Sequence, residues 1–393
     1  MSNKVPQIRF NGYSDAWVQR NLSDLATFSK GKGYSKSDLV SDGFPAILYG
    51  RMYTNYESQI NDVSDTFVAD VTDAVLSQTG DVIVPGSGET PEDIARASNV
   101  NVSGVVLGGD INIIRPDAEK MDSTFLALTI SNGQQQTELI KRAQGKSVVH
   151  LHNSDLKKVN VVAPSKDEQR AISSLFNQLD NLIDANQRKL DLLKEQKKGY
   201  LQKMFPKNGS KVPELRFAGF ADDWEHRKLK DVVEKQIKGK AQFEKLAPGS
   251  VEYLDTSRLN GGEAILTNGL KDVTLDDILI LWDGSKSGTV YHGFEGALGS
   301  TLKAYRTSAN SKFVYQYLKR HQDNIYNNYR TPNIPHVQKD FLDVFTISVP
   351  KSDEQEKIGS FFKQLDETIA LHQRKLDLLK EQKKGYLQKM FAK

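Results

Sequence analysis

The sequence predicts two mixed α/β (α+β) modules, each followed by a long helix, with the two helices paired as an antiparallel coiled coil. Three observations predict this internally repeated fold. A stretch of 19 residues occurs twice without change, apolar residues in and before it follow a heptad pattern, and the rest of the chain holds short runs of β-branched residues.

The repeat QRKLDLLKEQKKGYLQKMF covers residues 187–205 and 373–391. Weaker matches extend the similarity on the N-terminal side of both copies. These are PSKDEQRAISSLFNQLD at 164–180 with PKSDEQEKIGSFFKQLD at 350–366, and VPQIRFNGYSDAW at 5–17 with VPELRFAGFADDW at 212–224. The chain is therefore two copies of one unit, and the first copy carries the longer variable module.

The repeat divides the chain into five parts. We expect a first module over 1–163, a first constant helix over 164–205, a linker over 206–211, a second module over 212–349 and a second constant helix over 350–393. The linker PKNGSK contains a proline and a glycine, which stop a helix, and it is too short to act as a long tether.

Apolar residues in each constant helix recur at alternating steps of four and three. This spacing predicts a coiled-coil seam over about four to five heptads. At 1.5 Å per residue, about 39 residues make a rod of roughly 58 Å. If both modules meet their helices with one geometry, the second helix runs antiparallel to the first. The seam residues are Ile172, Phe176, Leu179, Ile183, Leu190 and Leu193, and Ile358, Phe362, Leu365, Ile369, Leu376 and Leu379.

Both modules contain short β-branched runs between Gly, Asn, Asp and Ser, which is typical of strands. Such runs lie at 81–85, 111–114 and 278–281, and helical stretches lie near 122–142 and 311–328. The pattern favours mixed α/β modules with exposed loops.

The loops of both modules mix aromatic, cationic and amide side chains. Arg, Lys and Asn side chains can read base edges, and Lys and Arg hold phosphates, so we expect DNA contacts there. Ordinary polar loops are the alternative. The candidate residues are Arg51, Tyr53, Asn55, Tyr56, Ser87, Lys146, Ser285, Lys286, Ser287, Tyr329, Arg330 and Thr331.

The net charge of the chain is +3, but the two 19-residue copies carry +4 each. Positive charge is therefore concentrated on the constant helices. It could contact DNA phosphates or an acidic partner surface, or it could form an ordinary solvated helix face.

No convincing catalytic constellation is present. The chain has no cysteine, which excludes disulfides, Cys-ligated zinc, iron–sulfur clusters and thiol nucleophiles. Gly145-Lys146-Ser147 is similar to the end of a phosphate loop, but Ile140 stands where that loop needs glycine. Glu195 and Lys197 have a nuclease-like spacing but lie on a constant helix, and the seven histidines show no metal spacing. We expect a non-catalytic chain that binds no metal or cofactor.

The sequence also lacks a targeting or spanning signal. No apolar stretch approaches the roughly 20 residues of a membrane span, and the first residues form no hydrophobic signal region. We therefore expect a cytoplasmic protein.

The duplicated plan resembles the specificity subunit of type I restriction–modification enzymes. The resemblance rests on the pattern Pro-x-x-x-Glu-Gln-x-x-Ile…Phe…Leu-Asp, which occurs at 164–180 and 350–366, and it covers nearly the whole chain. It implies that each module is a target recognition domain that reads one half of a split DNA sequence. The helices would act as the spacer that sets the gap between the halves.

The resemblance also implies partners. Double-stranded DNA would be the ligand, two methylation subunits would carry S-adenosylmethionine and methylate adenine, and restriction subunits with ATP and Mg would join for cleavage. Two other interpretations stay open at this point. One is a self-sufficient methyltransferase–nuclease, against which the missing motifs argue. The other is a stand-alone repressor or coiled-coil scaffold.

Overall fold

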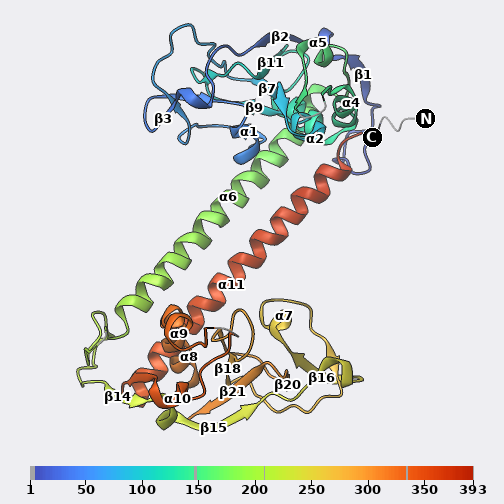
Figure 1. Cartoon of the computed structure of the whole chain (residues 1–393). Coiled ribbons are helices and arrows are strands. Elements are labelled where there is room, and N and C mark those ends of the chain that lie inside the picture. The colour runs from blue at the N-terminus through green and yellow to red at the C-terminus, as the bar shows by residue number, and fades with distance from the viewer. Residues whose placement is uncertain (1–4, 146–147, 208, 333–334, 393) are drawn as a thin grey trace. The chain divides into compact units, whose positions relative to one another are not determined.

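The computed structural model describes residues 5–145, 148–207, 209–332 and 335–392. The chain divides into two compact units (Figure 1). Unit 1 consists of Met1–Asn186 and Lys375–Lys393, and unit 2 consists of Gln187–Arg374. Each unit therefore contains one module, the first half of the helix that follows it, and the second half of the other long helix.

The first module contains short strands and helices. Its strands are β1 (Val18–Asn21), β2 (Ala26–Lys30), β3 (Leu39–Val40), β4 (Phe44–Ile47), β5 (Gln59–Ile60), β6 (Phe67–Val68), β7 (Asp81–Pro85), β8 (Ser87–Gly88), β9 (Ser98–Val100), β10 (Val106–Leu107), β11 (Ile111–Pro116), β12 (Val149–His150) and β13 (Asn160–Ala163). Its helices are α1 (Arg51–Thr54), α2 (Pro91–Ile94), α3 (Ser123–Asn132), α4 (Gln134–Arg142) and α5 (Asn153–Leu156), with 3₁₀ turns η1 (Leu22–Asp24) and η2 (Lys36–Asp38).

The second module repeats this plan in fewer residues. Its strands are β14 (Glu225–Lys228), β15 (Val233–Lys238), β16 (Pro248–Leu254), β17 (Leu266–Thr267), β18 (Ile278–Leu281), β19 (Val290–Tyr291), β20 (Ala297–Leu298), β21 (Leu302–Thr307) and β22 (Thr346–Val349). Its helices are α7 (Thr256–Leu259), α8 (Ser311–Arg320), α9 (Gln322–Asn328) and α10 (Phe341–Val344), with 3₁₀ turns η3 (Leu229–Val232) and η4 (Phe243–Lys245).

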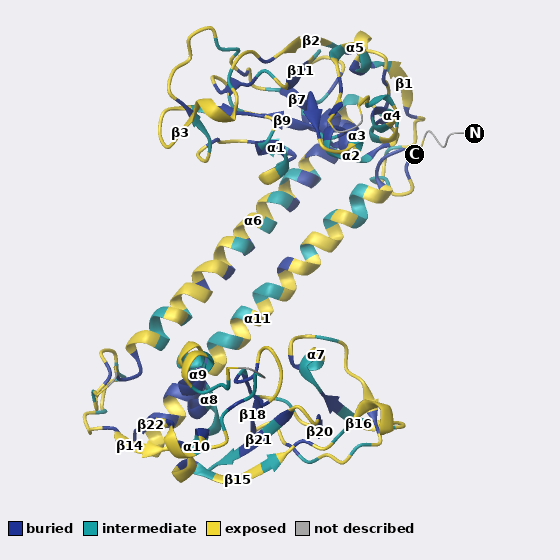
Figure 2. Ribbon diagram, viewed as in Figure 1, coloured by how far each residue is buried: buried dark blue, intermediate teal, exposed yellow. Residues whose placement is uncertain are grey.

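A central sheet organises each module, in the order β2-β11-β7-β9-β5 in unit 1 and β15-β21-β18-β19 in unit 2. Successive side chains of a strand face opposite sides of the sheet. Accordingly, Val82 and Val84 of β7 pack with α3 in one core, and Ile83 packs in a second core on the other face. Figure 2 shows this part of unit 1 in dark blue, as buried. In unit 2 the same alternation separates Ile278 and Ile280 from Leu279 and Leu281.

An excursion of the chain covers the second face of each sheet. We call these excursions lobe 1 (residues 31–80, between β2 and β7) and lobe 2 (residues 239–276, between β15 and β18). Each lobe begins with a glycine at a close approach of two backbones. A Cβ on Gly31 would lie 2.0 Å from the Gly108 carbonyl oxygen, and one on Gly239 would lie 1.9 Å from that of Gly299. No larger residue fits at either position.

The long helices are α6 (Lys166–Lys203) and α11 (Ser352–Lys389), of 38 residues each. They run antiparallel in both units, as predicted. In unit 1, Lys383 of α11 is bonded to Asp180 of α6. In unit 2, Lys197 of α6 lies 2.6 Å from Asp366 of α11, and Lys194 lies 3.4 Å from Gln373, so rising numbers on one helix meet falling numbers on the other.

All twelve predicted seam residues are buried or half-buried. Part of the seam has a second role, because Ile172, Phe176 and Leu179 belong to the core of the first module, and Ile358 and Phe362 belong to the core of the second. The seam is therefore where each module is attached to its own helix as well as where the helices meet.

The predicted strands at 81–85, 111–114 and 278–281 are present. The predicted helical stretches are each two helices, because α3 and α4 are separated at Gly133, and α8 and α9 at His321. Within the part of the chain that the structure describes, no helix combines the length and apolar character needed to cross a membrane.

Candidate nucleic-acid interface and helix-docking contacts

Both modules build the same structure at the end of their central strand. Ser87, which follows β7, pairs with His150 of β12, and Asp283, which follows β18, pairs with His336. The two histidines are 186 residues apart, which is the spacing of the constant segments. We call the surroundings edge 1 (residues 86–88 and 148–152) and edge 2 (residues 283–289 and 326–332). Of the described candidates for DNA contact, one lies in edge 1 and six lie in edge 2: Ser87, and Ser285, Lys286, Ser287, Tyr329, Arg330 and Thr331.

Edge 1 is held by hydrogen bonds around Ser87. The Ser87 Oγ lies 3.1 Å from Nδ1 of His150, and the Tyr53 hydroxyl donates to the Ser87 carbonyl oxygen. Burial raises the pKa of the Tyr53 phenol, so it stays a neutral donor. The ring of His150 stacks on that of His152, with centroids 6.3 Å apart. Edge 1 therefore joins candidates from two distant parts of the sequence.

The candidates on and after α1 are largely used inside the module. Arg51 has only 5% of its side chain exposed, and its guanidinium lies 2.8 Å from both Glu57 and Asp65. Asn55 Nδ2 also donates to Asp65, over 2.8 Å. Burial alone would raise the pKa of Asp65, but the bonds from Arg51 and Asn55 lower it overall. Arg51 thus holds the loop in place, and its charge is compensated.

Tyr56 is bonded in the same region. Its hydroxyl donates to the Ala97 carbonyl over 3.1 Å, and Arg96 lies over its ring at 5.0 Å from the centroid. Lys146, the remaining candidate of the first module, lies outside the described residues.

Edge 2 contains an exposed turn whose backbone is hydrogen-bonded to Arg330. Arg330 donates to the Ser285 carbonyl over 2.9 Å and to the Tyr326 carbonyl over 2.9 Å, and it lies 5.0 Å from the Tyr326 ring centroid. Lys286, the residue after Ser285 in this turn, is exposed. The Thr331 Oγ1 lies 3.0 Å from Nδ1 of His336. The structure thus brings Ser285, Lys286 and Arg330 together.

Two other candidates of the second module point inward. Ser287 is fully buried, and its Oγ has no hydrogen-bond partner among the described residues. Tyr329 packs edge-on against Phe341 and Phe345, at 5.4 Å between ring centroids in both cases. These side chains therefore support edge 2 from inside the module instead of facing a ligand.

Sequence reasoning missed one cation, Lys303, which lies on Trp282, the residue directly before edge 2 in the sequence. The Nζ of Lys303 lies 3.2 Å from the centroid of the Trp282 ring, and burial lowers the pKa of its ammonium. Trp282 follows β18 directly, so the available signal was an aromatic residue at the end of a predicted strand.

Replacing Lys286 by alanine is expected to weaken DNA binding of the assembled complex about tenfold, because an exposed cation that reaches a base or phosphate contributes about 1–3 kcal/mol. The number of counterions released on DNA binding, read from the slope of log affinity against log salt concentration, should fall by about one. Fluorescence anisotropy across a salt series measures both. The matched control is Lys245→Ala, an exposed lysine of lobe 2 in the same module. Equal affinities of the two variants would remove Lys286 from the interface.

The repeated sequence motif attaches each module to its helix. Arg9 forms a two-pronged ion pair with Glu168, at 2.6 and 2.7 Å, and Arg216 forms the same pair with Glu354, at 2.7 Å for both bonds. Both carboxylates are buried. Sequence reasoning missed this pair, although both partners recur at matching places in the repeats.

The glutamine of the motif closes the same junction. Gln169 donates to the Pro164 carbonyl over 3.0 Å and accepts from the backbone of Asp122 over 2.9 Å. Gln355 makes the corresponding bonds to Pro350, over 2.7 Å, and to Asn310, over 2.8 Å. Asp122 and Asn310 are the N-caps of α3 and α8, so each glutamine links the start of a long helix to the start of a core helix.

The aspartate at the end of the motif receives a lysine from the other long helix. Asp366 accepts from Lys197 over 2.6 Å and from Gln316 over 2.8 Å. Asp180 accepts from Lys383, and from Ser58 over 2.8 Å. Lys197 and Lys383 are the same position of the 19-residue repeat, so the two pairs are reciprocal and one lies in each unit. Glu195-Gln-Lys197 is thus part of helix pairing.

The end of each 19-residue copy enters the core of a module. Phe205 packs against Trp224, Phe313, Tyr317 and Phe362 in unit 2, with ring centroids 5.6–6.1 Å apart. Phe391 packs against Phe125 and Phe176 in unit 1, at 6.0 and 5.9 Å. Each module is therefore held between its own helix and the end of the other one.

Replacing Lys197 by methionine is expected to destabilise unit 2 by about 1–3 kcal/mol, because Asp366 keeps its charge at a part-buried position and loses its cation. Lys383→Met should do the same to unit 1. Hydrogen exchange of α8 and α3, respectively, measures each effect. The double variant with Asp366→Asn, which removes the unpaired charge and keeps an oxygen acceptor for Gln316, should recover most of the loss; if it is instead less stable than the single variant, the pair is not the cause.

Comparisons with known proteins follow the same division of the chain. A family model described as the type I restriction modification DNA specificity domain matches residues 14–195 and 221–381.

Within the described ranges, no cluster of three or more His, Asp or Glu residues is arranged to hold a metal ion.

Two curated relatives come from Methanocaldococcus jannaschii. The type I restriction enzyme MjaVIII specificity subunit is 30% identical over 196 residues, which is 47% of this chain and 44% of the relative, so this match spans less than half of either protein. The putative type I restriction enzyme MjaX specificity subunit is 21% identical over 413 residues, covering 94% of this chain and 91% of the relative.

Solved structures share the fold. The S subunit of a type I restriction–modification system from M. genitalium matches with a TM-score of 0.73 at 17% identity, covering 99% of both chains. A chain from a structural study of type I complex assembly and conformational transition matches with a TM-score of 0.51 at 15% identity, covering 94% of this chain and 96% of that chain.

Proposed function

Since the chain belongs to the type I restriction modification DNA specificity family, with two family domains in one chain, we propose that it chooses the DNA sites on which a methylation and restriction complex acts. It is the non-catalytic specificity subunit, and its two modules are target recognition domains. Each module reads one half of a split target, and adenines in that target are then methylated by partner subunits.

One observation carries this proposal. Both modules build an edge at the end of the central strand through the same pairing, Ser87 with His150 and Asp283 with His336, yet their loops differ in sequence. A constant frame with variable loops suits two readers that recognise different short sequences. The motif residues and the 19-residue copies supply the constant frame.

The chemistry belongs to the partners in this proposal. Two methylation subunits hold S-adenosylmethionine, and restriction subunits with ATP and Mg join for cleavage. The complex acts on double-stranded DNA in the cytoplasm. Exposed cations of the 19-residue copies, such as Arg188 and Lys189, remain available for DNA phosphates or for a partner, whereas Lys197 and Lys383 are paired within the chain.

Mapping of methylated adenines in cells with and without this chain tests the proposal. We expect methylation at a split sequence only when the chain is present, together with co-purification of a methyltransferase. Methylation that persists without the chain would contradict the proposal. Sequence-specific DNA binding with no methyltransferase partner would favour a stand-alone repressor instead.

A further inference from the structure

The two lobes carry an unusual share of the exposed apolar surface. Single exposed apolar side chains are normal, but their concentration in one region marks an interaction site. Of the 23 large apolar side chains that are exposed among the described residues, twelve lie in the lobes, which hold 88 of the 393 residues. They are Leu39, Val40, Phe44, Tyr49, Tyr56, Val71 and Leu76 in lobe 1, and Phe243, Ile265, Leu266, Leu270 and Leu275 in lobe 2. Much of the chain around β3 and β16 is accordingly yellow in Figure 2.

Both lobes are also acidic, although the whole chain is basic. Lobe 1 contains three Lys or Arg residues and seven Asp or Glu residues, and lobe 2 contains four and six, so their net charges are −4 and −2 against +3 for the chain. DNA binding depends on cations that neutralise phosphates. Surfaces of this sign repel DNA and attract a basic protein surface.

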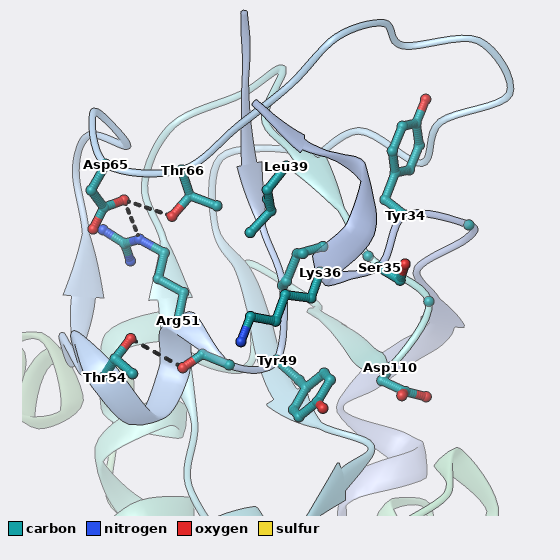
Figure 3. A pocket seen from close by; sticks show the side chains of 15 residues that line it. Tyr34, Ser35, Lys36, Leu39, Tyr49, Arg51, Thr54, Asp65, Thr66 and Asp110 are labelled. Atoms are coloured by element: carbon teal, nitrogen blue, oxygen red, sulfur yellow. Dashed lines mark hydrogen bonds and ion pairs between the residues drawn. The ribbon is translucent and has the colours of Figure 1, made fainter. Parts of the chain in front are cut away.

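Lobe 1 also contains a hollow of a size that receives side chains of a partner. It has a volume of about 740 Å³, and Tyr34, Lys36, Leu39, Tyr49 and Asp110 are among the residues that line it (Figure 3). Leu39, Tyr49 and Asp110 are exposed at the surface. Hollows with aromatic and aliphatic walls are where the strongest contacts of protein interfaces form.

One wall of this hollow is held in place by ion pairs. Arg51 and Asp65, which also line it, are joined by a 2.8 Å ion pair (Figure 3). The same guanidinium is also bonded to Glu57, over 2.8 Å. The hollow is therefore formed before any partner arrives, which lowers the entropy cost of binding.

We propose that lobe 1 and lobe 2 are protein-docking surfaces, one on each module, and that each receives a basic, apolar surface of a methylation subunit. The inference rests on the proposed function, in which two such subunits assemble on the chain. The lobes occupy the same place in the two modules and share charge sign and apolar character, so two copies of one partner can dock in the same way. DNA is read elsewhere, at edges 1 and 2.

The test measures assembly and DNA recognition separately in the full chain. The lobe 1 variant carries Leu39→Ser and Phe44→Ser, and the lobe 2 variant carries Leu266→Ser and Leu270→Ser. All four side chains are exposed, Leu270 by 80%, so these changes should cost little folding stability. The matched control is Val18→Ser, an exposed apolar residue of β1 outside both lobes. Asp42→Lys with Asp62→Lys tests the charge of lobe 1.

The probe is the methylation subunit that co-purifies with the chain, produced separately and titrated by calorimetry. We expect each lobe variant, and the charge variant, to weaken one of two binding steps at least tenfold. The combined lobe variant should weaken both steps, and Val18→Ser neither. Fluorescence anisotropy with target DNA, measured without the methylation subunit, should give each variant a DNA affinity within twofold of that of the unaltered chain.

Three results would overturn the inference. Unchanged binding of the methylation subunit to both lobe variants is one. Loss of DNA affinity with intact assembly is another, since the lobes would then face DNA. The third is self-association of the unaltered chain that the lobe variants abolish, because a second copy would then be the occupant. If the unaltered chain itself neither binds the methylation subunit nor directs methylation, the proposed function fails, which is a distinguishable result.

Discussion

Phe391→Ala is expected to destabilise unit 1 by about 3–5 kcal/mol, and Phe205→Ala to destabilise unit 2 by the same amount, which is the usual cost of removing a core phenylalanine. Both rings are buried in aromatic clusters of a module that belongs to the other half of the repeat. Hydrogen exchange of α3 in unit 1 and of α8 in unit 2 reads the two effects separately.

Leu378→Ala and Leu192→Ala are the controls for these substitutions. They lie in the same 19-residue copies, but their side chains are 65% and 52% exposed, so each should change stability by no more than about 0.5 kcal/mol. Faster exchange in unit 2 with unchanged protection in unit 1 for Phe391→Ala would contradict the packing of Phe391 in the core of the first module.

Adding one heptad to both long helices is expected to change the gap of the recognised sequence without changing either half. The insertions go after Asn186 and after His372, which correspond in the repeat and lie near the division between the units. Seven residues add about 10.5 Å of helix, or about three base pairs of DNA, and a whole heptad keeps the seam in register.

Methylation mapping of the heptad variant measures this gap. An insertion of two residues in each helix is the control, because it turns every later seam residue away from the partner helix and should abolish methylation. A heptad variant that methylates the original sequence with its original gap would contradict a spacer role for the helices.

The repeated architecture could be predicted from the sequence because its signals are strong and local. An unchanged 19-residue repeat and a heptad seam specify long paired helices regardless of what surrounds them, and α6 and α11 follow the prediction closely. The runs of aliphatic residues likewise predicted β7, β11 and β18, since strands buried on both faces are largely apolar.

Which of the candidate residues for DNA contact are exposed could not be predicted equally well, because exposure is decided by tertiary contacts. Arg51 has the residue type of a phosphate ligand, yet Asp65 and Glu57 bind it inside lobe 1. Ser287 lies in a polar turn but is fully buried, while its neighbour Lys286 is exposed. Neither residue type nor local sequence pattern shows which of these side chains is used inside the module.

The structure explains part of the identity between the 19-residue copies. Lys197 and Lys383 pair with corresponding aspartates, and Phe205 and Phe391 enter corresponding cores. The same docking surface on both modules requires the same residues. Exposed positions of the copies, such as Leu192, are identical too, and packing gives no reason for that.

In the proposed function, each module alone reads one half of a split DNA target. Exchanging residues 212–349 for the corresponding module of another family member, and then mapping methylated adenines across the genome, tests it most directly. We expect one half of the methylated sequence to change while the other half and the gap stay as they were. A change in both halves, or in neither, would contradict it.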